Sequence, residues 1–331
     1  MNNFSEQLTN TIYGVAVGDA LGNPVQFYDR ERVQANPVTD MVSGGVYHKK
    51  AGTWTDDTSM TLCLLASLGE KGELDYEDVM KNFQAWLFDN KFTTESKAFD
   101  VGRTCAKAIF AKSEGNPALE CGGKGEHENG NGSLMRISPI VFYIDKLLGA
   151  DAFDSDKAFE IVHNTSSLTH AHPIALIGCD IYVAILLELL HGCKKEEVRL
   201  KALPRIGQFV NRHPEYQYAL DQYSRIIHMI PTDLTKLDEK EIKSSGYVVD
   251  TLEAALWAFL TTNSYKECLL KAVHLGYDAD SVGAVAGGLA GLYYGGDIQN
   301  GIPNEWEEKL RGKKMINGIL KEFAEKFYMM A

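Results

Sequence analysis

Two segments of this sequence each begin with a pair of aspartates and continue as a strongly apolar helical pattern. Residues 58–68 (TSMTLCLLASL) follow Thr55–Asp57, and residues 281–294 follow Asp278–Asp280. Apolar side chains surround most of the first pattern, which is typical of a helix buried on nearly every side. A chain with two such helices must enclose both in a core, with carboxylates held at their N-terminal ends.

Helical patterns also cover much of the remaining chain, at residues 76–88, 97–111, 174–191, 251–261 and 264–275. An extended pattern at residues 38–47 predicts either a short strand or an ordered loop. No β-α-β alternation appears, so we expect no doubly wound sheet. With 331 residues, 45% of them hydrophobic, the chain can bury a sizeable core. We predict an all-α fold, as a single compact multi-helix domain over residues 1–331.

Two polar stretches interrupt these patterns. Residues 113–133 are rich in glycine and charge, and a loop of that length in a compact domain is usually functional or mobile. Residues 194–245 mix proline, charge and aromatic side chains, and we interpret them as a peripheral insertion. Neither stretch has the composition of a linker, so we keep one domain.

The helical pattern after the second acidic cluster carries glycine at every fourth position, at Gly283, Gly287 and Gly291. Glycine within a helix costs up to about 1 kcal/mol relative to alanine, so such a stripe indicates a neighbouring helix packed at very close range. Small residues also fill the first helical pattern, which contains Asp19. A buried acid needs a partner, so Asp19 is either a hydrogen-bond acceptor behind a site or part of a structural pair.

Each acidic cluster is consistent with a helix cap or with a cation site. One Asp, Ser or Thr satisfies the free N–H groups of a first turn, and negative charge suits that end of the helix dipole. Each cluster carries more carboxylate than one cap requires, and the surplus charges repel one another unless a cation joins them. Carboxylate and hydroxyl oxygens suit hard cations such as Mg²⁺ or Mn²⁺. Two clusters that meet in space could hold two ions, with one carboxylate bridging them.

Three other motifs contain candidate site residues, namely the glycine-rich turn with Asn131, Gly132 and Ser133, the pair His170 and His172, and Asp100. Glycines before a helix let backbone N–H groups approach an anion, although a generic turn gives the same pattern. Two histidines before a helix can bind a metal or a sugar phosphate, or can be ordinary polar structure. An acid at a helix start can be a cap or a functional group. No nucleophile signature indicates covalent catalysis.

Charge and cysteine content bear on partners and compartment. The net charge of -12 argues against nucleic-acid and anionic-membrane partners, because both require a basic face. The N-terminal residues lack the pattern of a secretory signal, and the apolar stretch 174–190 contains Asp180 and Glu188, which favours a buried helix of a soluble protein. Six dispersed cysteines are typical of reduced core thiols, so we expect a cytoplasmic protein.

Five motifs occur in one order along the chain, namely GDALG at 18–22, GTWTDDTSM at 52–60, GNGSLMR at 130–136, SLTHAHP at 167–173 and DADSVGAVAGGLAG at 278–291. In this combination the sequence resembles the ADP-ribosylglycohydrolase family, which includes the dinitrogenase reductase-activating glycohydrolase and the ADP-ribosylarginine hydrolases. Each motif alone is weakly specific, whereas five in order are highly specific. The resemblance runs from the first helical pattern to nearly residue 295.

The resemblance implies an all-α domain with a centre of two divalent cations, Mg²⁺ or Mn²⁺. It implies six metal ligands, namely Thr55, Asp56, Asp57, Asp278, Asp280 and Ser281, with Asp280 as the bridge. It assigns catalysis to Asp57, Asp100 and Asp280, with Asp100 near the scissile bond. Substrate binding falls to Asn131, Gly132 and Ser133 for the diphosphate of ADP-ribose, to His170 or His172, and to Tyr277.

Three positions depart from the family pattern. Gln26 stands where several relatives carry a glutamate, which weakens any role for an acid there. Tyr277 replaces a common glycine, and we expect it to narrow the pocket. Ser281 replaces a common threonine and keeps the hydroxyl ligand. The metal set is intact, so the departures concern the choice of substrate.

The resemblance implies hydrolysis of the glycosidic bond between ADP-ribose and a protein side chain, arginine above others, or a small ADP-ribosylated acceptor. The alternative is a non-catalytic ADP-ribose-binding, nucleotide-binding or structural protein of the same fold, against which the intact acid set argues. A nucleic-acid end as acceptor is disfavoured by the acidic charge. We expect a monomer that acts on an ADP-ribosylated protein or small molecule, with no nucleic-acid or membrane partner.

Overall fold

The computed structural model describes residues 3–228 and 233–328. Within them the chain is built from helices and loops, and no strand longer than an isolated bridge is present. The prediction of an all-α fold is therefore confirmed. The α-helices are α1 (Asn3–Gly22), α2 (Arg30–Ala35), α3 (Asp56–Lys71), α4 (Tyr76–Asp89), α5 (Arg103–Ser113), α6 (Ile140–Leu148), α7 (Asp156–Ser167), α8 (Pro173–Leu190), α9 (Val198–Arg212), α10 (Gln217–Asp221), α11 (Ser224–Ile227), α12 (Val248–Leu260), α13 (Tyr265–Val273), α14 (Ala279–Tyr294), α15 (Asn304–Lys309) and α16 (Lys313–Tyr328).

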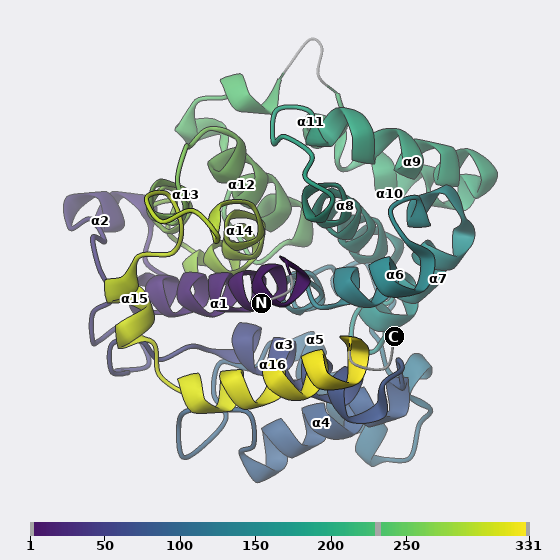
Figure 1. Ribbon diagram of the computed structural model, residues 1–331, viewed down its shortest axis with the longest axis horizontal. Coiled ribbons are helices and arrows are strands. Elements are labelled where there is room, and N and C mark those ends of the chain that lie inside the picture. The colour runs from purple at the N-terminus through teal and green to yellow at the C-terminus, as the bar shows by residue number, and fades with distance from the viewer. Residues whose placement is uncertain (1–2, 229–232, 329–331) are drawn as a thin grey trace.

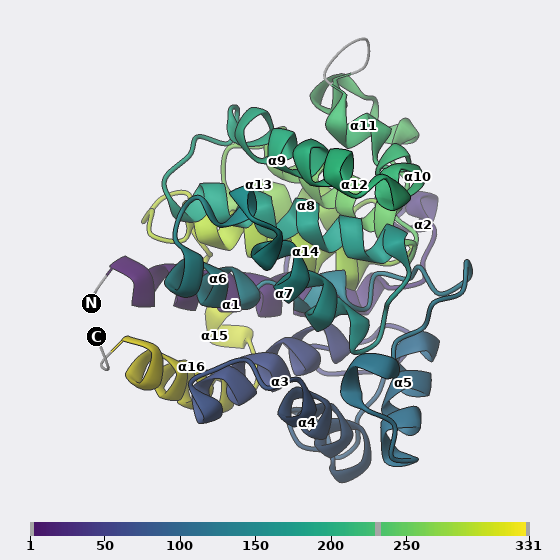
Figure 2. The same ribbon diagram turned by 90° about the vertical axis from the view of Figure 1, so that its right-hand side faces the viewer.

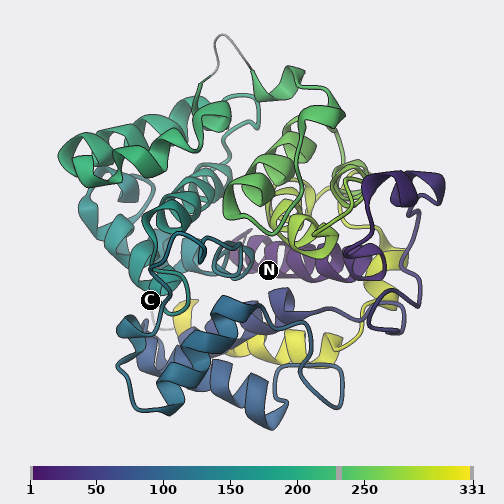
Figure 3. The same ribbon diagram turned by 180° about the vertical axis from the view of Figure 1, so that it is seen from behind.

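Helix α1 lies across the middle of the molecule, between two groups of helices (Figure 1). Helices α3, α4, α5 and α16 lie on one side of it, and α8, α9, α12, α13 and α14 lie on the other, as the side view also shows (Figure 2). From behind, the green and teal helices of the second group lie above the purple α1, and the blue helices with the yellow α16 lie below it (Figure 3). The first helix thus contributes side chains to both halves of the core.

Helices α1 and α14 pack with their backbones in direct contact. A Cβ atom added at Gly18 would lie 2.1 Å from the carbonyl oxygen of Gly283, and one added at Gly14 would lie 2.2 Å from that of Gly287. The pairs run in opposite directions along the two helices, so the C-terminal end of α1 meets the N-terminal end of α14. The close packing predicted from the glycine stripe is confirmed, and it brings Asp19 to the start of the second acidic cluster.

The apolar helix α8 is a core helix. It is long and apolar enough to cross a membrane, yet 83% of its residues are buried within the structure. It packs against α7, α9 and α12, as expected for the centre of a helical layer.

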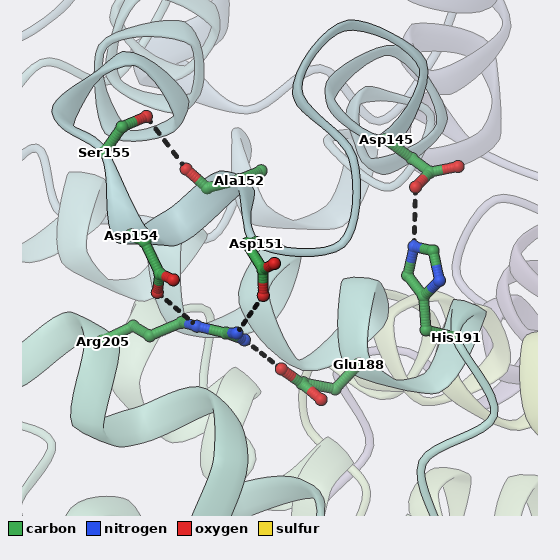
Figure 4. Close-up of polar contacts among 8 residues, drawn as sticks. All are labelled: Asp145, Asp151, Ala152, Asp154, Ser155, Glu188, His191 and Arg205. Atoms are coloured by element: carbon green, nitrogen blue, oxygen red, sulfur yellow. Dashed lines mark hydrogen bonds and ion pairs between the residues drawn. The ribbon is translucent and has the colours of Figure 1, made fainter.

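Residues 194–245 contain α9, α10 and α11, and Arg205 of α9 fastens this region to its neighbours. The guanidinium donates hydrogen bonds to Glu188 of α8 and, at 2.9 Å and 3.2 Å, to Asp154 and Asp151 (Figure 4). Next to this network His191 lies 2.7 Å from Asp145 of α6. The region proposed as a peripheral insertion is therefore in polar contact with the core helix α8.

One helix boundary and several helices differ from the sequence-based expectations, and residues 38–47 take one of the two forms predicted for them. The helix expected at 97–111 begins at Arg103, because Asp100 has a left-handed φ of 60° and Gly102 is extended. Residues 38–47 form an ordered loop, in which only Gly44 pairs, with Lys49, as an isolated bridge. Helices α6, α7, α9 and α16 lie in stretches for which no helix was expected. In α7, α9 and α16 many polar residues cover the outer face and mask the apolar stripe that each helix buries, whereas α6 is short and mostly apolar.

Candidate functional site

A cavity of about 320 Å³ opens where the first turns of α3, α5 and α14 meet the loops at 26–27, 127–132 and 170. Its lining includes eight residues singled out in the sequence, namely Gln26, Asp56, Asp100, Asn131, Gly132, His170, Asp278 and Ser281. These residues span most of the chain, and the fold alone brings them together. We call Asp19, Asp57 and Asp280 the floor; they do not line the cavity themselves, but Asp57 and Asp280 are next in sequence to the lining residues Asp56 and Ser281. We call Gln26, Tyr47 and Asp100 the rim.

The floor is a buried group of three acids. Carboxylate oxygens of Asp19, Asp57 and Asp280 all lie within 4.8 Å of one another, and each of the three residues is at most 1% exposed. The close contact of α1 with α14 delivers Asp19 and Asp280, while Asp57 comes from the first turn of α3. Three carboxylates so close together in a core require neutralisation by protons or by a cation.

Asp19 caps helix α3 from outside that helix. Its carboxylate accepts hydrogen bonds from the backbone N–H of Thr55 at 2.9 Å, and from the N–H and hydroxyl of Thr58 at 3.0 Å and 2.6 Å. The N-cap residue Thr55 makes no side-chain cap of its own. The capping function thus belongs to Asp19, and the two aspartates of the first turn are free for another task.

Several floor oxygens have no hydrogen-bond partner among the described residues. These are Oδ1 of Asp57 and both carboxylate oxygens of Asp280, all fully buried. The other Asp57 oxygen accepts from the Thr55 hydroxyl at 2.9 Å. Unpaired buried carboxylate oxygens are costly, which makes them natural ligands for a hard cation. The residues present therefore fit a divalent metal ion.

Burial changes the protonation of the floor. Desolvation raises the pKa of Asp19 to about 7, although its hydrogen bonds from Thr55 and Thr58 act to lower it. Desolvation also raises the pKa of Asp57 and of Asp280 well above the usual carboxyl range. Repulsion from neighbouring aspartates adds to the last two shifts. Without a cation these groups hold protons that a metal ion would displace.

The cavity wall above the floor contains Asp56, Asp278 and Ser281. One Asp278 oxygen accepts a hydrogen bond from the Asn131 amide at 2.5 Å, and the Ser281 hydroxyl also bonds this carboxylate. Burial raises the pKa of Asp278 to about 6. Of the predicted ligands, Asp57 and Asp280 thus belong to the floor, together with Asp19, which was not predicted as a ligand. Asp56, Asp278 and Ser281 line the cavity, and Thr55 bonds Asp57.

The rim holds Asp100 between two side chains. The Tyr47 hydroxyl donates to Oδ1 of Asp100 at 2.6 Å, and the Gln26 amide donates to Oδ2 at 2.8 Å. Asp100 precedes the first turn of α5, where the N-cap position belongs to Gly102. The capping alternative for Asp100 is therefore wrong, and its carboxylate lines the cavity instead.

The glycine-rich turn contributes only part of its predicted set. Asn131 and Gly132 line the cavity, whereas Ser133 is fully buried and accepts a hydrogen bond from the Ser166 hydroxyl at 2.8 Å. Arg136, which is 1% exposed, donates to the Gly132 carbonyl and at 3.2 Å to that of Thr165. A buried guanidinium thus fixes the turn from behind.

The two histidines have different environments. His170 lines the cavity, and burial together with the charge of Arg136 lowers its pKa to about 3, so its ring is neutral. The Thr169 hydroxyl lies 2.8 Å from its Nδ1 atom. His172 is the N-cap residue of α8, and its Nδ1 accepts from the Ile174 N–H at 3.3 Å. Of the pair, only His170 faces the cavity.

Tyr277 lies outside this cavity. It is 49% exposed and lines a wider neighbouring cavity of about 1070 Å³, together with residues of α2 and of the 238–245 segment. Its backbone, with a left-handed φ of 56°, donates to the Tyr28 carbonyl at 2.7 Å and accepts from the Phe27 N–H at 2.6 Å. The residue therefore fixes the loop that carries Gln26, whereas we expected it to narrow the pocket.

Sequence reasoning missed several cavity residues. Phe27, Arg103, Cys105 and His127 line the cavity, and Tyr47 holds Asp100 from just outside its lining. Phe27 follows Gln26 directly, and Arg103 follows Gly102 at the start of α5, so both had a local signal. Tyr47 had none, because only the folded loop brings it to Asp100.

Comparison with known proteins gives consistent matches over the whole chain. The family model described as ADP-ribosylglycohydrolase matches residues 1–331. The chain is 32% identical over 327 residues to the ADP-ribosylarginine hydrolase Tri1 of Pseudomonas putida, covering 97% of this chain and 78% of that one. It is 32% identical over 300 residues to the ADP-ribosyl-[dinitrogen reductase] glycohydrolase of Rhodospirillum rubrum, covering 90% and 87%. A solved structure described as an ADP-ribosylglycohydrolase-related protein complex is similar with a TM-score of 0.77 and 27% identity, over 99% of this chain and 100% of that one.

Proposed function

Since this chain belongs to the ADP-ribosylglycohydrolase family and is a glycohydrolase, we propose that it hydrolyses, with divalent cations, the glycosidic bond between ADP-ribose and an arginine side chain. The observation that carries the metal part of the proposal is the set of unpaired, buried carboxylate oxygens on Asp57 and Asp280. Such oxygens have no satisfactory partner in the protein itself.

Two divalent cations, Mg²⁺ or Mn²⁺, would be held by oxygen ligands from both acidic clusters. We assign to them Thr55, Asp56 and Asp57 from one side and Asp278, Asp280 and Ser281 from the other, with Asp280 as the bridge. Asp280 supports this role because neither of its oxygens has a partner among the described residues. When bound, the ions would supply the positive charge that orients ribose hydroxyls and makes a water more acidic.

The cleaved bond joins C1 of the ribose to a guanidine nitrogen. As this bond breaks, its electron pair goes to the nitrogen and the ribose takes on oxocarbenium character. A water oxygen then bonds to C1, and the proton that the water loses ends on the leaving guanidine. Asp57 and Asp280 would face the ribose, while Asp100 would take up a proton or hydrogen-bond the guanidinium. Asp100 lines the cavity, and Asp57 and Asp280 belong to the buried floor, next in sequence to the lining residues Asp56 and Ser281.

Substrate binding would use the groups along the wall. Gly132 and the neutral ring of His170 line the cavity and would offer donors to the diphosphate and ribose. Asn131 also lines it, but its amide N–H groups donate to Asp278 and Thr251, so it would hold the wall in place. Arg136 adds a buried positive charge directly behind Gly132. Ser133 and His172 would support the site only indirectly, through the packing of the turn and of α8.

Arginine is proposed as the acceptor for two reasons. One is the similarity to a relative named as an ADP-ribosylarginine hydrolase. The other is that the Asp100 carboxylate and the exposed Phe27 line the same cavity, and anionic and aromatic groups both suit a guanidinium. An ADP-ribosylated small molecule is the next acceptor to test.

The proposal extends to partners and compartment. The net charge of -12 supports an enzyme without nucleic-acid or membrane partners. Six buried free thiols support a reducing compartment, so we propose a cytoplasmic enzyme that acts as a monomer on ADP-ribosylated proteins.

The test is release of ADP-ribose from arginine-, serine- and nucleotide-linked substrates, each with Mg²⁺, with Mn²⁺ and with EDTA. We expect turnover of the arginine linkage, lost in EDTA and restored by added cation. Equal rates with and without EDTA would contradict the metal part of the proposal. Binding of ADP-ribose without hydrolysis of any linkage would favour a non-catalytic binding protein.

A further inference from the structure

Asp100 reaches the cavity from a backbone conformation that its surroundings must maintain. Its φ of 60° lies in the left-handed region, which residues other than glycine adopt uncommonly and which clusters at functional sites. Asp100 belongs to no helix, because α5 begins three residues later at Arg103. The direction of its carboxylate therefore depends on side-chain contacts.

Two contacts hold this carboxylate, one on each oxygen. The Tyr47 hydroxyl donates to Oδ1 at 2.6 Å, the length of a charge-assisted O–H···O bond, and the Gln26 amide donates to Oδ2 at 2.8 Å. Burial and the bond to Asp100 raise the pKa of Tyr47, so its phenol stays protonated and remains a donor. The carboxylate cannot rotate without breaking one of these bonds.

Tyr47 is itself held in place. It lies in a loop closed by the Gly44–Lys49 pair, with N···O distances of 2.8 Å and 3.0 Å. Its ring contacts those of Phe99 and Phe27 edge-on, at centroid distances of 5.3 Å and 6.4 Å. The donor on Asp100 is therefore part of a packed unit and not a freely rotating surface side chain.

We propose that Tyr47 is a positioning residue for the reaction, which together with Gln26 holds the Asp100 carboxylate in the direction of the leaving group. The inference rests on the proposed function, because it concerns the acceptor side of that reaction. Tyr47 lies outside the cavity lining, so it acts on the substrate only through Asp100.

This role makes a prediction that depends on the leaving group. A guanidine must be hydrogen-bonded or protonated as it departs, so its release depends on how Asp100 is held. A 4-nitrophenolate leaves as a stable anion and needs no proton. Loss of the Tyr47 hydroxyl should therefore slow the first reaction and spare the second.

The experiment compares Tyr47→Phe with Tyr13→Phe in the metal-loaded enzyme. Tyr13 is a matched control, since its hydroxyl donates to a side-chain oxygen of Asn317 at 2.8 Å, and it takes no part in the cavity. Each variant is assayed on ADP-ribosylarginine and on ADP-ribose carrying a 4-nitrophenyl group. Calorimetry measures the affinity of each variant for ADP-ribose.

For Tyr47→Phe we expect kcat on ADP-ribosylarginine to fall about tenfold to hundredfold, the loss expected for one hydrogen bond to a charged group. KM, ADP-ribose affinity and nitrophenyl turnover should stay within about twofold. Gln26→Leu, which removes the other donor, should show the same selective loss. Tyr13→Phe should lower neither reaction.

Two results would overturn the positioning role, namely unchanged arginine turnover in Tyr47→Phe or an equal loss on both substrates. Should Tyr47→Phe fail to fold, Gln26→Leu decides by the same criterion. An unmodified enzyme that hydrolyses neither substrate overturns the proposed function, and the positioning role with it, so the two failures are distinguishable.

Discussion

The floor and the rim of the cavity hold carboxylates in opposite ways. On the floor, Asp57 and Asp280 project from the first turns of helices, and three of their four carboxylate oxygens have no partner among the described residues. At the rim, Asp100 projects from a loop, and both of its oxygens accept a hydrogen bond. Unpaired oxygens on rigid supports suit a cation, whereas a clamped carboxylate on a loop suits a group that meets the substrate.

The largest expected effect is on turnover and on stabilisation by Mn²⁺, and it should distinguish the cation ligand Asp280 from the rim acid Asp100. Asp280→Asn should lower turnover about a thousandfold and remove the stabilisation by Mn²⁺, because a bridging ligand is lost. Asp100→Asn should also lower turnover but keep that stabilisation. ADP-ribose release and thermal unfolding, each with and without Mn²⁺, measure both. A wild-type shift in unfolding temperature in Asp280→Asn would rule out its bridging role.

The next effect tests whether the floor depends on the contact between α1 and α14. Gly18→Ala would force a Cβ atom to 2.1 Å from the Gly283 carbonyl oxygen, so we expect a loss of about 1–3 kcal/mol in the free energy of unfolding, together with weaker cation binding. Gly207→Ala in α9 is the control, because its Cβ would meet no atom within 4 Å. It should stabilise by up to about 1 kcal/mol. Urea unfolding measures the free energy of unfolding of both variants. An equal change in the two would contradict a special role for the contact between α1 and α14.

Much of the floor could be predicted from the sequence, because its information is local. Paired aspartates before an apolar pattern indicated both clusters. The glycine stripe indicated the close contact between α1 and α14, which places Asp19 beside the second cluster. The rim could not be predicted in the same way. Asp100 was expected within or at the start of a helix, and its left-handed φ depends on contacts with Gln26 and Tyr47, which lie 74 and 53 residues away.

Tertiary contacts also account for the individual residues that differed from expectation. Ser133 and His172 stand in motifs beside true cavity residues, and a sequence motif does not reveal which side chain turns inward. Their neighbours Gly132 and His170 line the cavity, because the turn is fixed by Arg136 and by the bridge from Gly123 to His170. Such directions are set by tertiary contacts, not by residue type.

The pH dependence of stability should come largely from the floor when no cation is bound. Burial raises the pKa of Asp19 to about 7 and that of Asp278, on the wall, to about 6, above the value of about 4 for an unfolded aspartate. Between pH 4 and 7 the unfolded chain therefore releases these protons before the folded one does. Their stabilising contribution is complete below pH 4 and is lost as pH rises towards 7.

Unfolding measured from pH 4.5 to 7.5 tests this sign. In EDTA the contribution of these groups to the free energy of unfolding should decrease as the pH rises. In the range below pH 6, Asp278→Asn should make this decrease smaller. With Mn²⁺ the trend should reverse, because protons compete with the cation for the same oxygens. A stabilisation by Mn²⁺ that is as large at pH 4.5 as at pH 7.5 would contradict a carboxylate site.

The smallest effect distinguishes the two histidines of one motif. His172→Ala removes an N-cap acceptor whose contact with the Ile174 N–H is long, at 3.3 Å, so we expect a cost of about 0.5–1 kcal/mol in unfolding and unchanged affinity for ADP-ribose. His170→Ala should instead weaken ADP-ribose binding, since that neutral ring lines the cavity. Calorimetry with ADP-ribose separates the two. If His172→Ala weakened binding as much as His170→Ala, the ADP-ribose site would extend past the turn to the start of α8, and His172 would contact the substrate.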